Sequence, residues 1–154
     1  MARYIRFEES RPSQVREMLQ TAPVAYIPFG SLEWHGEHNP LGLDGVKVEE
    51  LLKRTAEVTG GVLFPTVFWG AFNTMPFPFT FHFSPAIMQM TVWKILRQLR
   101  RNGFKVIVML TGHYPLSYLI HLHLQARILN RKAGAVAMAF PGRWPLPWRP
   151  PVSS

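Results

Sequence analysis

Short apolar runs alternate with stretches of helical periodicity along most of this chain, and this alternation limits the possible folds more than any other feature. The apolar runs are expected to be buried strands, at about 24–29, 62–68, 105–110 and 134–140, and the aromatic loop at 69–83 is expected to hold a further short strand around 79–83. Helical patterns lie before and between them, at about 10–20, 46–59, 85–102 and 115–131. Strands joined by helices of this length form right-handed crossovers, so we predict a parallel sheet in a layered α/β fold.

The length and composition of the chain fit one packed domain. Its 154 residues are 47% apolar and 17% charged, which is typical of a globular protein with a single core. We expect residues 1–140 to form this domain. The last residues, 141–154, hold five of the fourteen prolines together with Trp144 and Trp148 and have no periodicity. We expect them to form an extended proline-rich tail or an arm that lies on a partner.

The sequence lacks the features of a membrane protein, of a signal peptide and of a metal site built from cysteine. No stretch has the roughly 18 uncharged apolar residues that a membrane-spanning helix needs, and charged residues occupy the place of a signal-peptide core. We therefore expect a soluble, cytoplasmic protein without a membrane partner. The chain has no cysteine, so a transition metal would have to be held by histidine and carboxylate side chains.

The net charge of +8 is compatible with nucleic-acid binding, but the arrangement of the cations argues against it. They cluster where two predicted helices end, around Arg100 and Lys105 and around Arg127 and Lys132. Positive side chains in the last turn of a helix are expected from the helix dipole alone. We favour a solvated surface over binding to nucleic acid or to another anionic surface.

Candidate metal ligands follow two of the predicted strands. Glu33 and His35 lie two residues apart just after the first strand, where an extended backbone places both on one face, and Asp44 follows in the same loop. His113 follows the strand at 105–110. Ligands of parallel sheets bind at the carboxyl ends of strands, and a mixed set of nitrogen and oxygen donors suits Zn²⁺, Mn²⁺ or Fe²⁺. The pattern alone leaves a second reading open, in which these side chains make ordinary turn or cap hydrogen bonds.

Two motifs in this chain resemble those of the creatininase (creatinine amidohydrolase) family. The first is the family's run Gly-Ser-x-Glu-x-His-Gly-x-His-x-Pro with an aspartate several residues on, matched here from Gly30 to Asp44. The second is a strand that ends in Asn-Gly-His or Thr-Gly-His, matched by 103–113 with its Gly-Phe start. The resemblance extends over roughly residues 20–140, with both motifs in the family's order.

The resemblance implies a three-layer α/β/α fold with a mostly parallel sheet, a homo-oligomer, and hydrolysis of a small non-peptide or cyclic amide. By position, Glu33, His35, Asp44 and His113 would bind one or two divalent ions, Zn²⁺ or Mn²⁺ with Fe²⁺ as a further possibility. His38 matches a recurring position, where we expect it to serve catalysis by orienting a metal ligand or the substrate through a hydrogen bond. The bound metal would lower the pKa of water toward about 7 and polarise the scissile carbonyl.

The chain departs from the family in two places. Pro115 stands where creatininase itself supplies a carboxylate ligand, and the family continues beyond the end of this chain with another acidic ligand and substrate-facing residues. Our first hypothesis is a metal-dependent amidohydrolase. The alternative is a truncated homologue that binds metal without catalysis and acts as a subunit of an oligomer. A third and weaker hypothesis is a basic binding protein that docks an acidic partner.

Overall fold

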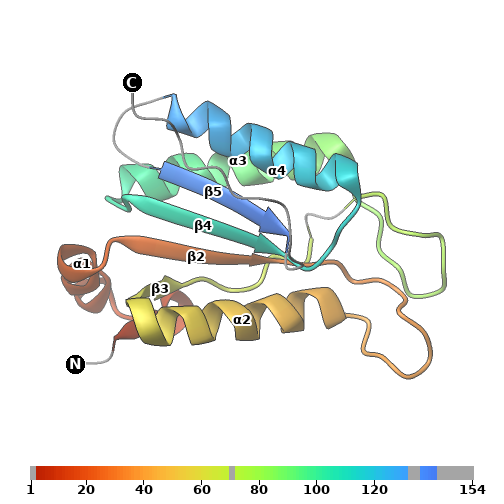
Figure 1. Cartoon of the computed structure of the whole chain (residues 1–154), viewed down its shortest axis with the longest axis horizontal. Helices are drawn as coiled ribbons and strands as arrows, with labels where there is room; N and C mark the ends of the chain where they lie inside the picture. The colour runs from red at the N-terminus through yellow and green to blue at the C-terminus, as the bar shows by residue number, and fades with distance from the viewer. Residues whose placement is uncertain (1–2, 70–71, 132–135, 142–154) are drawn as a thin grey trace.

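The computed structural model describes residues 3–69, 72–131 and 136–141 and has a parallel five-stranded sheet between layers of helices (Figure 1). The strand order is β1-β3-β2-β4-β5. The strands are β1 (Tyr4–Arg6), β2 (Val24–Phe29), β3 (Gly61–Leu63), β4 (Val106–Thr111) and β5 (Val136–Pro141). The helices are α1 (Pro12–Thr21), α2 (Leu43–Thr59), α3 (Pro85–Arg101) and α4 (Leu116–Asn130), and a short 3-10 helix, η1 (Phe7–Glu9), follows β1. The predicted three-layer α/β/α architecture is confirmed.

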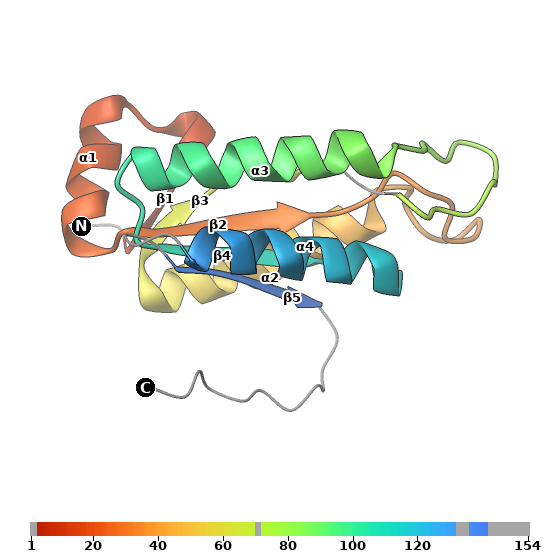
Figure 2. The same ribbon diagram turned by 90° about the horizontal axis from the view of Figure 1, so that it is seen from above.

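The direction of each connection determines which face of the sheet its helix covers. The connections through α1, α3 and α4 run toward the β5 edge, whereas the connection through α2 runs back toward the β1 edge. Right-handed crossovers that run in opposite directions place their helices on opposite faces. Figure 2 shows α3 and α4 on one face of the sheet, and Figure 1 shows α2 on the other.

The strand β2 is packed on both of its faces. Ala25, Ile27 and Phe29 belong to the larger core, which includes residues of α3 and α4, while Tyr26 packs with Leu52 of α2 in a smaller core. Successive side chains of a strand point to opposite faces, so each face of β2 is covered by a different helix layer. Burial of each large apolar side chain contributes roughly 1.5–3 kcal/mol. The end of β2, where the first motif begins, is therefore held from both sides.

The structure differs at three places from the strands that were expected from the sequence. The edge strand β1 was not predicted, because three residues are too few to show a periodicity. The run at 62–68 gives only the short strand β3, since Pro65 has no N–H group to continue the ladder. Val67 makes one isolated bridge to Phe29 beyond that proline. A short strand expected at 79–83 is absent from this described segment, where Phe79 has a φ of +61° and the chain is irregular.

The arginines that were expected at two helix ends lie there in the structure. Arg100 and Arg101 lie in the last turn of α3 and Arg127 lies in the last turn of α4, as the helix dipole favours. Among the described residues, no helix combines the length and the apolar character that crossing a bilayer requires. The predicted tail at 141–154 begins with the last residue of β5, and its other residues, 142–154, lie outside the described part of the chain.

A close approach of three backbone segments fixes the start of α2. Gly30 follows β2 and contacts the backbone of Asp44 and Gly45 in the first turn of α2, and Gly112 follows β4 and contacts the backbone of Asp44. A Cβ atom on Gly112 would lie 2.9 Å from the Cα atom of Asp44, and a Cβ atom on Gly30 would overlap the backbone of Gly45. Only glycine permits such contact between backbones, so these positions determine where Asp44 lies.

We expect Gly112→Ala to lower the free energy of unfolding by about 1–3 kcal/mol, because the new methyl group must displace the backbone of Asp44. Gly42→Ala is the matched control, since its Cβ atom would meet the side chain of Phe68 at 3.2 Å and the backbone φ of −92° suits any residue. Urea denaturation measures both changes. Equal stabilities of Gly112→Ala and the wild type would contradict the tight contact.

Candidate metal centre

The predicted metal ligands meet at the carboxyl ends of β2 and β4. These strands are neighbours in the sheet, with Phe29 paired to Thr111 at their last residues. Glu33 and His35 lie in the loop that follows β2, and His113 lies just beyond β4. Asp44 lies in the first turn of α2, where its negative charge also suits the helix dipole. Two motifs that are far apart in the sequence thus form one site.

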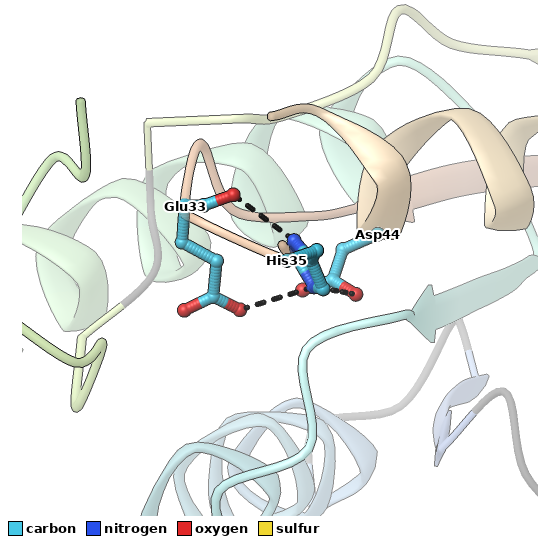
Figure 3. A group of neighbouring side chains, drawn as sticks. All are labelled: Glu33, His35 and Asp44. Carbon is cyan, nitrogen blue, oxygen red and sulfur yellow. Dashed lines mark hydrogen bonds and ion pairs between the residues drawn. The ribbon is translucent and has the colours of Figure 1, made fainter. Parts of the chain in front are cut away.

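Glu33, His35 and Asp44 point their polar atoms toward one another (Figure 3). One donor atom from each of them lies within 4.8 Å of the others. The Nε2 atom of His35 is 3.3 Å from Oδ1 of Asp44 and 3.7 Å from Oε1 of Glu33. The Nδ1–H group of His35 donates to the backbone carbonyl of Glu33 at 3.0 Å. This bond fixes the ring orientation and leaves Nε2 free to coordinate a metal ion.

His113 joins the same group from the second motif. Its Nδ1 atom is 2.9 Å from Oε1 of Glu33 and 3.5 Å from Oδ2 of Asp44. On the other side of the ring, Nε2–H donates to the backbone carbonyl of Phe72 at 2.8 Å. The His113 ring is therefore anchored through one nitrogen while the other faces two carboxylates, which is the arrangement typical of a metal-binding histidine.

Sequence reasoning missed Ser31, which lies between the two carboxylates. Its hydroxyl group is buried and within hydrogen-bonding distance of Oδ2 of Asp44, at 2.6 Å, and of Oε1 of Glu33, at 2.9 Å. A hydroxyl group has one proton, so it donates to one carboxylate at a time and keeps both close to a common point. Its place inside the first motif was the available signal, but a serine after a strand is also common in ordinary turns.

His38 is the predicted site residue that lies away from the cluster. It is exposed, and its ring lies against Gly36, where a Cβ atom would be 3.0 Å from Cε1 of His38. In the described part of the chain it has no hydrogen bond or ion pair to the four predicted ligands. Its expected role in orienting a ligand or the substrate remains a prediction.

The electrostatics of the site depend on His113 and Asp44. Burial by itself would lower the pKa of His113, but hydrogen bonds to Asp44 and Glu33 outweigh it and raise the pKa to about 9. Burial would raise the pKa of Asp44, but hydrogen bonds from His113 and Ser31 keep it below its usual value. At neutral pH a protonated His113 therefore compensates part of the carboxylate charge. A divalent cation at this place would take over that compensation.

Residues 8–148 match the family described as creatininase, creatinine amidohydrolase. The chain belongs to the creatininase family. A curated relative is the creatinine amidohydrolase of Pseudomonas putida, which is 32% identical over 103 residues, covering 63% of this chain and 40% of the relative.

Solved creatininase structures have the same fold as this chain. A crystal structure of creatinine amidohydrolase superposes with a TM-score of 0.76 at 23% identity and covers 88% of this chain and 57% of its own. A zinc–zinc form of a creatininase mutant has a TM-score of 0.78 at 23% identity and covers 92% of this chain and 58% of its own. The chain thus spans between two fifths and three fifths of the length of these creatininases.

The pKa of His113 predicts how the stability of the metal-free protein depends on pH. Because folding raises this pKa from 6.5 to about 9, the protonated ring stabilises the fold fully below pH 6.5, and that contribution disappears as the pH rises through about 9. We expect the free energy of unfolding of EDTA-treated protein to fall across this range in urea titrations. His113→Ala should remove this part of the pH dependence. A wild-type stability that stays constant from pH 6.5 to 9 would contradict it.

Removal of the Ser31 hydroxyl group tests its place between the carboxylates. We expect Ser31→Ala to lower the free energy of unfolding by about 1–3 kcal/mol, because Asp44, which is buried, and Glu33, which is partly buried, lose one of their hydrogen-bond donors. Thr55→Ala is the control, since its hydroxyl group bonds only within α2 on an exposed face. Thermal or urea denaturation reports both. An unchanged stability of Ser31→Ala would show that the hydroxyl group does not support the site.

Proposed function

We propose that this chain is a metal-dependent amidohydrolase that cleaves the C–N bond of a small non-peptide or cyclic amide. The observation that carries the proposal is the convergence of Glu33, His35, Asp44 and His113, which come from three segments of the chain and turn their donor atoms to one place. Membership of a family described as creatinine amidohydrolase supports the reaction class. One of the solved creatininases is a complex with creatine, which supports a small-molecule substrate.

The donor set fits a divalent transition metal. Two carboxylates and two imidazoles are a mixed set of oxygen and nitrogen ligands that suits Zn²⁺ or Mn²⁺, with Fe²⁺ also compatible. The two carboxylates, Glu33 and Asp44, approach each other with Ser31 between them, so a cation would remove their mutual repulsion. The creatininase structures include a manganese form and a zinc–zinc form. We propose Zn²⁺ or Mn²⁺ for this site, as one or two ions.

When bound, the metal ion would supply a water molecule that is acidic enough to ionise near neutral pH and would polarise the amide carbonyl. The residues of this chain prepare the site for it. The carbonyl of Glu33 orients His35, and the carbonyl of Phe72 orients His113. Ser31 holds the two carboxylates at a fixed separation. Because these contacts hold each ligand in its orientation, the ligands need little reorganisation to receive the ion.

The alternative is a metal-binding homologue without catalysis that acts as a subunit of an oligomer. Pro115 favours this alternative, because proline offers no donor side chain beside the site. Exposed aromatic side chains of the loop near the site, Phe77, Phe79 and Phe81, would suit a contact with a second copy of the chain. A cytoplasmic location is inferred from the sequence alone.

Turnover of a panel of cyclic amides and formamides, with added Zn²⁺ or Mn²⁺, tests the enzyme proposal. We expect the wild type to hydrolyse at least one of them and Glu33→Gln to lower kcat/KM by about 100-fold or more, since a neutral amide is a poor metal ligand. His123→Gln, on the exposed side of α4, is the matched control and should retain the wild-type rate. A folded, metal-loaded wild type that hydrolyses none of these amides would contradict the proposed enzyme activity. It would favour the metal-binding homologue without catalysis.

A further inference from the structure

Lys47 brings a positive charge to the edge of the metal centre. Its Nζ atom is 3.9 Å from Oδ1 of Asp44 and 4.6 Å from the centre of the Tyr114 ring. Lys47 belongs to α2, whereas Tyr114 follows His113 in the second motif, so this cation spans the two segments that supply the ligands. The ring face attracts the ammonium group and limits where it can lie.

Lys47 pairs with Asp44, three residues before it on α2, although a second acidic residue lies at the same spacing after it. Glu50 lies three residues further along α2, at a spacing that permits a pair with Lys47. In the structure, however, Glu50 pairs with Arg54 at 2.9 Å and with Lys53 at 3.5 Å. The ammonium group of Lys47 instead reaches back toward the first turn of α2, where the helix dipole does not favour a cation. The attraction of Asp44 and of the Tyr114 ring accounts for this placement.

Metal binding would change the balance of charge around Lys47. Asp44 is the counter-ion of Lys47. Once Glu33 and Asp44 neutralise a divalent ion, the ammonium group of Lys47 no longer has a counter-ion, and the metal centre together with Lys47 carries one net positive charge. The Lys47 side chain is 35% exposed, so an anion from solvent can reach it. An oxygen anion that touches both the ion and Lys47 would restore the balance.

We propose that Lys47 is a substrate-binding residue that accepts a carboxylate, either one carried by the substrate or the one formed in the reaction. This proposal rests on the metal centre proposed above. Hydrolysis adds water to the amide carbonyl carbon, the C–N bond breaks, the nitrogen leaves with a proton, and the carbonyl carbon becomes a carboxylate. Lys47 then contributes the charge that recognises this group next to the ion, and it selects against amides whose acyl part bears a cation.

The proposal predicts that one variant binds acetate more weakly and zinc more tightly than the wild type. In Lys47→Gln, acetate should bind the zinc-loaded protein about tenfold more weakly, because one of its two positive partners is lost. Zinc itself should bind several-fold more tightly, because a repelling charge has been removed. A merely structural role of Lys47 would have the reverse effect on zinc, since a displaced Asp44 would weaken zinc binding.

Isothermal titration of the full chain at constant ionic strength, first with Zn²⁺ and then with acetate, tests the proposal. Lys47→Arg should keep most of the acetate affinity, and Lys53→Gln, about two and a half turns along from Asp44 on the same helix, should behave as the wild type. Zinc binding with an acetate affinity unchanged in Lys47→Gln would overturn the role of Lys47 and leave the metal centre intact. A wild type that binds no zinc would overturn both proposals.

Discussion

The site depends on the contact between the first turn of α2 and the ends of β2 and β4. Gly30 and Gly112 let those strand ends touch the backbone of Asp44 and Gly45. The contact fixes the carboxylate of Asp44 relative to both loops that leave the sheet. Packing on both faces of β2 holds the other side of the contact in place. The chemistry of the site is thus set by backbone positions, and the side chains complete an arrangement that the sheet imposes.

Charge balance is the second constraint on this site. Two carboxylates close together in a partly buried place need compensation, and His113, Ser31 and Lys47 each provide part of it. These groups supply part of the compensation that a bound cation would supply. The same proximity that makes the carboxylates repel each other gives them affinity for a divalent ion, so stability without metal and affinity for metal are opposing consequences of one geometry.

The sheet and the predicted ligands could be read from the sequence because both follow from local patterns. Apolar runs and helical periodicity show the central strands and the helices, and parallel strands bring polar residues at their ends together. The edge strand β1 was too short to show such a pattern. The strand expected at 79–83 is not formed, because Phe79 has a positive φ that an extended strand does not permit. The roles of Ser31 and Lys47 depend on side-chain directions within a folded loop and helix. No spacing rule gives those directions.

The central claim is that Glu33 of the first motif and His113 of the second motif bind the same metal ion. Metal content per chain tests this claim most directly. Elemental analysis of purified, zinc-reconstituted protein should find bound zinc in the wild type and in His123→Ala, and a large loss in both Glu33→Ala and His113→Ala, which alter different motifs. Circular dichroism would verify that each variant is folded. Zinc retained in full by either folded ligand variant, or absent from the reconstituted wild type, would contradict a shared metal centre.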